Sequence, residues 1–417
     1  MSPDQPLSVL YTAFDVVPSP KGSSTHISQF VKGLVQRQCA VTLITAGDGV
    51  LPETGTYLGA RIHRVPPADA LYLNRALQFG EAVRIHVLQE PNRYDIAHFR
   101  SIWSGIHLVD VQRHAGYRTV FEVNGLPSIE LKYHFPDLAG SPTLEKIKQQ
   151  EAATLLNADH VICPSAVTAA YVASLGVPRD RTTVIPNGID PELFTPTGAP
   201  FSDPAVLLYV GTLARWQGLE TLLQALPLVL ESRTVQLRIV GKGRKDRQKA
   251  LLKAVRKAGL EPYVSLEDAC SHHTIPNLIN QASVCVAPLA FNDRNVTQGC
   301  CPLKILEYAA CARPIVASNL PVVRELLRDG EEGWLFTPDD PVDLARAVLA
   351  ALADEPRARQ MACAHAARIR AEYTWQSAQK RLLKVYHRLL DSLDGRPGRD
   401  VRRPVDPAGG GRSRYWR

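Results

Sequence analysis

The chain has 417 residues, more than one hydrophobic core usually supports, so we expect two domains. Apolar residues make up 45% and charged residues 21%, which is typical of a globular protein, and no apolar run approaches the roughly 20 residues that span a bilayer. No charged and then apolar leader opens the chain, and the eight cysteines lack paired spacing, so reduced thiols in a cytoplasmic protein are expected.

The net charge of +7 is concentrated at one end of the chain. Residues 395–417 hold seven arginines against two aspartates, with many Gly and Pro, so the remaining chain is almost neutral. This composition predicts a disordered basic tail. A solvated tail without function is one interpretation. The alternative is peripheral contact with an anionic membrane at its inner face, because clustered arginines followed by Tyr415 and Trp416 suit a lipid interface. No nucleic acid partner is expected, since no aromatic platform accompanies the charge.

Short apolar runs alternate with amphipathic segments in the first half of the chain. This pattern predicts strands at residues 7–14, 41–45, 95–97, 119–123 and 184–185, and helices at 27–37 and from Ser165 to Gly176. Apolar strands separated by helices favour a parallel sheet covered by helices. Residues 20–26 form the loop before the first helix, where Ser23, Ser24 or Thr25 are candidate helix caps.

A second unit of the same kind follows a hinge that is rich in Pro and Gly, residues 186–204. Strands are predicted at 206–210, 235–240 and 284–288, with helices at 219–230, 249–258 and, at the end, 375–393. The predicted fold class is therefore α/β, with two Rossmann-like domains that face each other across a cleft. In such folds a ligand binds at the carboxyl ends of the strands.

The most informative segment is residues 299–318. A loop of small residues enters a helix with Pro302 at its first turn, and Lys304 and Glu307 follow at i and i+3 on one helix face. A helix N-terminus offers unpaired backbone N–H groups and a positive dipole end, which suit a phosphate. Lys304 is suited to a diphosphate and Glu307 to a ribose diol, so the segment indicates a nucleotide site.

This segment resembles the donor-nucleotide signature of the retaining glycosyltransferases of family 4 (glycosyl transferases group 1), which have the GT-B fold. Further stretches match the family in the same order, and together they span about residues 8 to 390: Val184–Asp190, Tyr209–Gly211, Ile239–Gly243, Asp329–Phe336 and Tyr373–Trp375. The resemblance implies an acceptor domain at 1–190, a donor domain at 201–372, and a helix at 373–394 that crosses back to the first domain. Residues 395–417 remain as the tail.

The resemblance also implies an activity. We expect a glycosyltransferase that moves a sugar from a nucleotide diphosphate sugar, UDP- or GDP-linked, to a hydroxyl acceptor with retention. No metal and no cofactor is expected; no Asp-x-Asp occurs, and the adjacent His272 and His273 diverge. The acceptor is a saccharide, a lipid-linked molecule or a small metabolite, in glycan, polysaccharide or glycolipid biosynthesis. A nucleotide-sugar epimerase and a non-catalytic nucleotide-binding protein are the alternatives.

Residues that match the family's donor motifs are expected to bind the donor: Gly22, Gly211, Gln217, Gly218, Gly241, Gly243, Gly299, Leu303, Lys304 and Glu307. Two departures from the family pattern change this expectation. Many relatives have a lysine where this chain has Gln217, so Arg215 and Lys304 are expected to supply the cations. Gly299 replaces a glutamate that reaches the donor sugar, and either its backbone N–H or the side chains of Gln298, Thr297 or Asn295 are alternatives.

Three residues of the first domain complete the expected site. His26 starts the first helix and His98 closes a strand, and both are expected on the acceptor side of the cleft. Asn124 stands where many relatives have a histidine near the anomeric carbon. An amide cannot carry a proton at neutral pH, so Asn124 is expected to position substrate. The predicted catalytic group is Lys304, Glu307, Arg215 and Asn124.

Overall fold

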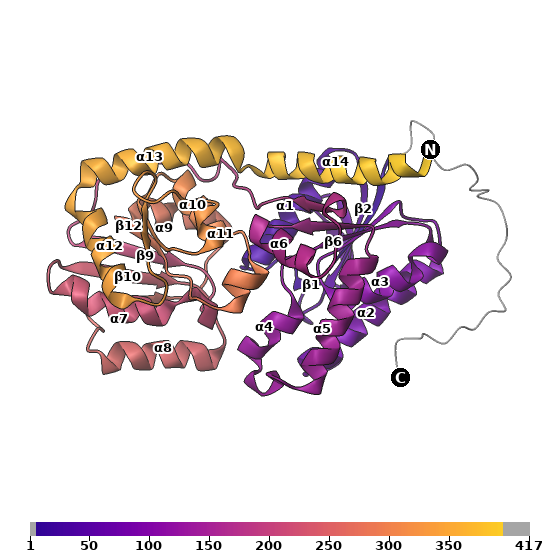
Figure 1. Cartoon of the computed structure of the whole chain (residues 1–417), viewed down its shortest axis with the longest axis horizontal. Helices are drawn as coiled ribbons and strands as arrows, with labels where there is room; N and C mark the ends of the chain where they lie inside the picture. The colour runs from indigo at the N-terminus through magenta and orange to yellow at the C-terminus, as the bar shows by residue number, and fades with distance from the viewer. Residues whose placement is uncertain (1–5, 395–417) are drawn as a thin grey trace.

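A computed structural model describes residues 6–394, and the predicted tail at 395–417 lies outside the described residues. The chain forms two lobes, each built on one sheet covered by helices, and the lobes lie side by side (Figure 1). Within the described part, no helix is both long and apolar enough to cross a membrane.

The first lobe contains an eight-stranded sheet of order β3-β4-β2-β1-β5-β6-β7-β8, parallel except where β3 pairs with β4. Its strands are β1 Ser8–Val16, β2 Ala40–Ala46, β3 Thr54–Tyr57, β4 Ala60–Val65, β5 Ile96–Phe99, β6 Arg118–Glu122, β7 His160–Cys163 and β8 Thr182–Val184. Its α-helices are α1 Gly22–Gln36, α2 Tyr72–Gln89, α3 Ile102–Ala115, α4 Pro127–His134, α5 Pro142–Asn157 and α6 Ala166–Ser174.

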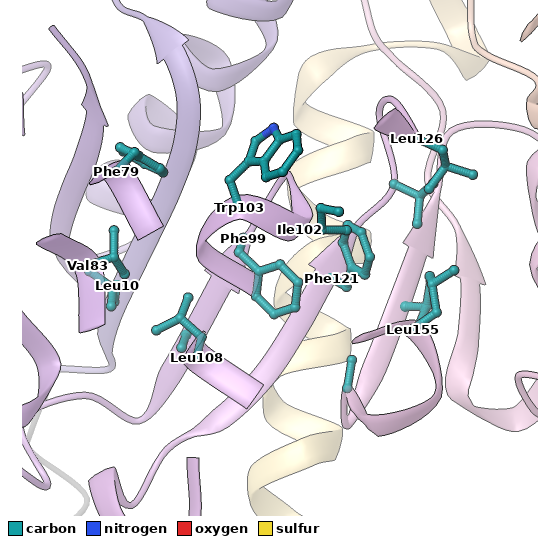
Figure 2. Packing of buried hydrophobic residues seen from close by; sticks show 14 of the residues in the cluster. Leu10, Phe79, Val83, Phe99, Ile102, Trp103, Leu108, Phe121, Leu126 and Leu155 are labelled. Carbon is teal, nitrogen blue, oxygen red and sulfur yellow. The ribbon is translucent and has the colours of Figure 1, made fainter. Parts of the chain in front are cut away.

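Large apolar side chains hold α2, α3 and α5 against one face of this sheet. Phe99 and Phe121, on neighbouring strands, are fully buried with their ring centroids 4.8 Å apart. Helix residues on either side of these rings belong to the same core cluster (Figure 2): Phe79 and Val83 from α2, Leu108 from α3, and Leu155 from α5. Because both faces of the sheet are covered, its central strands are mostly apolar, as parallel strands usually are, and Thr12, His98 and Glu122 are buried polar exceptions.

The second lobe contains a six-stranded parallel sheet of order β11-β10-β9-β12-β13-β14. Its strands are β9 Ala205–Val210, β10 Val235–Val240, β11 Val264–Glu267, β12 Val284–Ala287, β13 Ile315–Ser318 and β14 Trp334–Phe336. Its helices are α7 Leu219–Leu230, α8 Lys245–Lys257, α9 Ile275–Gln281, α10 Leu303–Ala310, α11 Pro321–Arg324, α12 Pro341–Ala353 and α13 Glu355–Glu372, with short helical turns η3 Arg215–Gln217, η4 His272–Thr274 and η5 Arg294–Gln298.

Each sheet has a point where the direction of its strand order reverses. In the first lobe β1 lies between β2 and β5, and in the second β9 lies between β10 and β12. The loops that leave two such neighbouring strands turn to opposite faces of the sheet and leave a crevice between them, where open α/β sheets bind ligands. The loops after β1, β5, β9 and β12 are therefore the first places to look for a site.

Helix α14, Trp375–Asp394, returns from the second lobe and packs along α1 of the first (Figure 1). Its buried residues Trp375, Leu382 and Tyr386 join a core cluster with Phe30 and Val31 of α1. The two places where the chain passes between the lobes lie side by side, because Ile189 N–H donates to Tyr373 O at 2.8 Å and Trp375 N–H donates to Ile189 O at 3.2 Å.

Helix α1 begins at Gly22, five residues before the start predicted from apolar spacing. The serines expected to cap it have other partners: Ser23 donates to Asp15 at 2.8 Å, and Ser24 Oγ accepts from Ser19 N–H at 2.9 Å. Lys21 is the N-cap and makes no side-chain cap. The first amides of α1 therefore belong to Gly22 and its neighbours, and they point into the loop after β1.

Leu382→Ala tests how strongly α14 is fastened to the first lobe. Leu382 is fully buried, so its truncation leaves a cavity between α14 and α1 and is expected to lower the free energy of unfolding by about 3 kcal/mol. Urea unfolding followed by circular dichroism measures this loss. Lys384→Ala, at an exposed position of the same helix, is the control, and equal stability of the two variants would contradict the packing described.

Candidate active site between the two lobes

Two helix N-termini from different lobes meet at the centre of the molecule. A Cβ placed on Gly22, at the start of α1, would lie 3.1 Å from Leu303 Cδ1, at the start of α10. Neither helix has a side-chain cap, since its N-cap residue is Lys21 or Pro302. The first N–H groups of an α-helix have no partner within the helix, and its N-terminus is the positive end of the dipole. Two such ends at one place form a site for an anion.

Lys304 lies beside these helix ends and is almost entirely enclosed, with 8% of its surface exposed. Its Nζ donates to Gln217 Oε1 at 2.6 Å and lies 3.8 Å from the centroid of the Tyr209 ring. Burial lowers the pKa of Lys304 to about 7; nearby Cys300 and Glu307 oppose this shift, and Arg294 adds to it. The lysine is therefore poised to gain a proton when an anion arrives.

Gly211 allows this approach of the lysine. A Cβ at Gly211 would lie 3.0 Å from Lys304 Nζ, and its φ of +151° is one that other residues rarely adopt. The predicted donor glycines Gly218 and Gly241 also lie where loops pack backbone to backbone, against Pro288 O and Gly211 O, and Gly243 packs against Leu213 Cβ. These positions bring the loops after β9, β10 and β12 together around Lys304.

Glu307 has a partner that the sequence analysis missed. His272 Nε2 lies 2.9 Å from Glu307 Oε1, and the histidine ring packs against Phe194 with centroids 5.3 Å apart. Both side chains are largely enclosed: 10% of the Glu307 side chain and 25% of the His272 side chain are exposed. In the sequence, the adjacency of His272 and His273 argued only against a metal. No strand was predicted at 264–267, so the place of His272 after β11, at the carboxyl edge of the sheet, was not foreseen.

The groups considered in place of the missing glutamate at Gly299 are mostly engaged. The Gly299 N–H donates to Arg294 O at 3.1 Å, and a Cβ there would lie 2.9 Å from Ser165 Oγ of the first lobe. Asn295 donates to Trp216 O and Ala290 O, at 2.8 Å each. These contacts fix the loop before α10, and Thr297 is the one exposed member of the set.

Gln298 joins the two lobes with both ends of its amide. Its Oε1 accepts from Leu126 N–H at 3.1 Å and its Nε2 donates to Glu130 Oε1 at 2.8 Å. Arg294 Nε also donates to Glu130, at 3.2 Å, and its guanidinium lies 5.3 Å from the centroid of the Trp216 ring. Arg294 is thus a second cation close to Lys304 that sequence reasoning did not single out.

Arg215 behaves differently from Arg294. It is exposed on the short turn η3, next to Trp216 and Gln217, and no ion pair is formed by it within residues 6–394. Its guanidinium is therefore available to a ligand at the mouth of the site. Lys132 and Tyr133 of α4 both bind Asp293 across the lobes, which closes the site on the side of η5.

Glu122 is a buried carboxylate at the end of β6, 2% exposed, that gathers five polar side chains around it. Oε2 accepts from Tyr11 OH at 2.7 Å and from His98 Nε2 at 2.9 Å. Oε1 is approached by the other three: His26 Nε2 at 2.6 Å, Arg100 Nε at 3.5 Å, and the Asn124 amide. Sequence reasoning singled out neighbours of Glu122 but not Glu122 itself.

The expected positions of His26 and His98 on the acceptor side of the cleft need correction. His98 is fully buried, with Nδ1 2.6 Å from Tyr386 OH of α14, and His26 is only 4% exposed. Both rings turn inward because a buried carboxylate requires hydrogen-bonding and charged partners. Asn124, which is partly exposed, is the member of this cluster that reaches the surface of the site.

Charge balance explains how Glu122 stays ionised. Burial alone would raise the pKa of its carboxyl, but His26 and Arg100 nearby and the hydrogen bonds from His26 and His98 hold it well below its usual range. The pKa of His98 is lowered chiefly by burial, against the pull of Glu122. His98 is therefore neutral, with Nε2–H donating to Glu122 and Nδ1 accepting from Tyr386.

No group of three or more His, Cys, Asp or Glu side chains within the described range of the chain is arranged to hold a metal ion. Lys304, Glu307, Gln217, Gly22 and Leu303 are brought together at the contact between the lobes, whereas His26 and His98 lie behind it. The arrangement offers helix amides and cations for an anion, with a carboxylate one helical turn away.

Two family models match the chain. The model described as Glycosyltransferase Family 4 matches residues 20–193, and the one described as Glycosyl transferases group 1 matches residues 204–354. D-inositol 3-phosphate glycosyltransferase from Thermomonospora curvata is 26% identical over 408 residues, which cover 89% of this chain and 92% of that protein. Glycogen synthase from Mycobacterium tuberculosis is 27% identical over 286 residues, 68% of this chain and 62% of that one.

Solved structures share the fold over nearly the whole chain. Sucrose-phosphate synthase from Thermosynechococcus elongatus superposes with a TM-score of 0.79 at 23% identity, covering 93% of this chain and all of that one. HepE from Anabaena, solved in complex with UDP-glucose, gives 0.73 at 17% identity with the same coverage. The fold is thus the two-lobed α/β arrangement expected from the sequence.

Lys304→Met tests the cost of enclosing this lysine. Because the pKa of Lys304 is lower in the folded state, its charged form reduces the free energy of unfolding. This reduction is complete below about pH 7 and shrinks as the pH rises toward 10.5, the pKa of an unfolded lysine. Methionine removes that cost, so the melting temperature of the variant should exceed that of the unchanged protein by more at pH 6 than at pH 9. Thermal unfolding without ligand measures both, and a variant less stable at pH 6 would contradict this environment.

Proposed function

Because the chain belongs to the family 4 glycosyltransferases of group 1, we propose that it transfers a sugar from a nucleotide diphosphate sugar to a hydroxyl acceptor with retention at the anomeric carbon. The observation that carries the proposal is the meeting of the α1 and α10 N-termini beside the enclosed Lys304. A diphosphate is the anion that matches two helix ends and a lysine, and it is the leaving group of this reaction.

Stabilising the leaving group is the main catalytic task. Breaking the glycosyl–phosphate bond builds negative charge on the diphosphate, so groups that bind it more strongly as the bond breaks speed the reaction. In our proposal the positive charge that balances it comes from Lys304, Arg215 and the backbone amides at Gly22 and Leu303. Gln217 holds the Lys304 ammonium in place through its carbonyl oxygen. A lysine at position 217 would put a like charge against Lys304 instead.

The nucleoside half of the donor is assigned to Glu307 and the glycines after β9 and β10. The Glu307 carboxylate, oriented by His272, is suited to accept hydrogen bonds from a ribose diol. Gly241 and Gly243 follow β10 and pack closely against Gly211 and Leu213, and we assign them to the base or the ribose. We favour uracil over guanine as the base, and HepE, a protein of the same fold that was solved with UDP-glucose, supports UDP as the first donor to test.

Same-face attack is the mechanism we prefer. The buried Glu122 is enclosed by Tyr11, His98 and Arg100, and Glu130 is held by Arg294 and Gln298, so neither carboxylate is placed as a free nucleophile. The acceptor hydroxyl then attacks from the side that the diphosphate leaves, and a phosphate oxygen takes its proton. Asn124 is proposed to position the substrate through its amide.

The acceptor is proposed to be a saccharide, a lipid-linked molecule or a small metabolite of glycan, polysaccharide or glycolipid biosynthesis. We place the enzyme in the cytoplasm, with peripheral membrane contact through the basic residues after 394. No divalent cation is required in this proposal, because helix amides and side-chain cations serve the diphosphate.

Lys304→Met is expected to lower the rate of transfer at least 100-fold while the protein stays folded, because the main cation at the leaving group is lost. Steady-state rates with UDP-sugars and a panel of hydroxyl acceptors measure this. Lys249→Met, at an exposed position of α8, is the matched control and should keep the full rate. Equal rates in both variants would remove Lys304 from the mechanism. Consumption of donor without any acceptor would favour the epimerase, and absence of any turnover would favour the non-catalytic protein.

Product stereochemistry and metal dependence test the remaining parts of the proposal. The anomeric configuration of the product, read from proton NMR during the reaction, is expected to equal that of the donor. EDTA at millimolar concentration is expected to leave the rate within twofold, since no step needs a divalent cation. An inverted product would exclude same-face attack, and a rate restored only by Mg²⁺ or Mn²⁺ would exclude metal independence.

A further inference from the structure

The Glu130 carboxylate lies between the lobes and uses only one of its two oxygens in the protein. Oε1 accepts from Arg294 Nε at 3.2 Å and from Gln298 Nε2 at 2.8 Å, both on the second lobe. Oε2 accepts no hydrogen bond from any group within residues 6–394, and 25% of the side chain is exposed. One oxygen therefore fixes the carboxylate, and the other is open to a ligand.

The open oxygen lies against the loop that leaves β6. A Cβ on Gly125 would lie 2.7 Å from Glu130 Oε2, so any larger residue at position 125 would push the carboxylate away. The residue before it, Asn124, reaches the surface of the site, and the residue after it, Leu126, donates its N–H to Gln298 Oε1 at 3.1 Å. Glu130 Oε2 thus lies beside Asn124, where this loop meets the second lobe.

Arg294 connects Glu130 with the proposed diphosphate site. Its guanidinium packs on the ring of Trp216, and the next residue, Gln217, accepts from Lys304 Nζ. Arg294 lies close enough to Lys304 to help lower the pKa of that lysine. In a nucleotide diphosphate sugar the sugar is bonded directly to the diphosphate, so a diphosphate at Lys304 brings the sugar within reach of the groups around Arg294.

A sugar held in an enclosed site needs acceptors for its hydroxyl groups, since an unpaired buried hydroxyl is costly. The loop before α10 has few acceptors left. Asn295 Oδ1 accepts from Arg294 Nη1 at 3.1 Å. Gln298 is engaged at both ends of its amide, and Gly299 has no side chain. Thr297 is exposed, but its neutral hydroxyl is a weaker acceptor than a carboxylate.

We propose that Glu130 is a specificity-determining residue that binds the donor sugar: its Oε2 accepts a hydrogen bond from one sugar hydroxyl. The first lobe thus supplies the carboxylate that the second lobe lacks at Gly299. This inference rests on the proposed function, and it names the residue that selects the sugar. Because a carboxylate only accepts, the contact requires a hydroxyl or an amino group at one position of the sugar, and it disfavours a carboxylate or a missing hydroxyl there.

The contact depends on the two lobes being together. The donors to Oε1 come from η5 of the second lobe, while the carboxylate stands on α4 of the first. Lys132 and Tyr133 of the same helix bind Asp293, which adds a second link close by. A merely structural link would need only Oε1 of Glu130, and an amide oxygen would serve it as well as a carboxylate oxygen.

Glu130→Gln in the full chain separates the roles of the two oxygens. Arg294 and Gln298 both donate, so the amide carbonyl is expected in the place of Oε1 and the NH₂ group in the place of Oε2. The link between the lobes is kept, while the open acceptor becomes a donor. Calorimetry with UDP, UDP-glucose, UDP-galactose and UDP-N-acetylglucosamine measures the effect. The Kd of UDP is expected to stay within threefold of that of the unchanged protein, while the ratio of the Kd of the tightest UDP-sugar to that of UDP rises at least tenfold.

Monodeoxy analogues of the tightest UDP-sugar identify the hydroxyl that Glu130 binds. In the unchanged protein, one analogue is expected to bind at least tenfold more weakly than the parent UDP-sugar. In Glu130→Ala the same analogue and the parent should bind alike, because the partner of that hydroxyl is gone. An analogue series that shows the same losses in both proteins would overturn the inference.

Asp293→Asn is the matched control. It weakens the neighbouring link through Lys132 and Tyr133 but leaves Glu130 in place, so any loss of affinity should be the same for UDP and for the UDP-sugar. Melting temperatures confirm that each variant is folded. An unchanged Kd ratio in Glu130→Gln would reduce Glu130 to a link between the lobes, and an unchanged ratio with a raised KM for the acceptor would assign it to the acceptor; either result overturns the inference. Failure of the unchanged protein to bind UDP or any UDP-sugar would instead count against the proposed function itself.

Discussion

The approach of Gly22 to Leu303 is the contact on which the site depends. It brings together the starts of two helices from different lobes, each without a side chain to satisfy its first amides. Any residue larger than glycine at position 22 would meet Leu303, and a capping side chain at either end would occupy the amides that an anion needs. The lobes thus meet where the first N–H groups of α1 and α10 have no partner within their helices and the dipoles of both helices are positive. The rest of the structure keeps these two helix ends together.

Two buried ionisable side chains, Lys304 and Glu122, differ in how their surroundings compensate for burial. Lys304 has only a neutral amide and an aromatic face as its closest partners, so its burial is incompletely compensated and its pKa falls. Glu122 is surrounded by Tyr11, His26, His98 and Arg100, so its pKa falls because the carboxylate is stabilised. Lys304 therefore lacks a counter-charge that a bound anion would supply, whereas Glu122 has permanent partners within the core.

Local spacing explains what could be predicted from the sequence. Lys304 and Glu307 share a face of α10 because a helix has 3.6 residues per turn, and the two sheets follow from apolar runs that alternate with amphipathic segments. What escaped prediction depends on distant partners. His98 was expected in the cleft, yet it binds Tyr386, 288 positions away, and Gln217 meets Lys304 across 87 positions. The start of α1 was missed because Ser23 and Ser24 bind other groups than the helix they seemed suited to cap.

Gln298 has a consequence for how such a protein can change over generations. One enclosed amide in the second lobe forms hydrogen bonds with a backbone N–H and a carboxylate at the start of α4 in the first lobe. A lineage that remodels α4 must keep these two hydrogen bonds or acquire a paired change at position 298. Substitutions at position 298 and at the start of α4 are therefore coupled, even though each lobe folds around its own sheet.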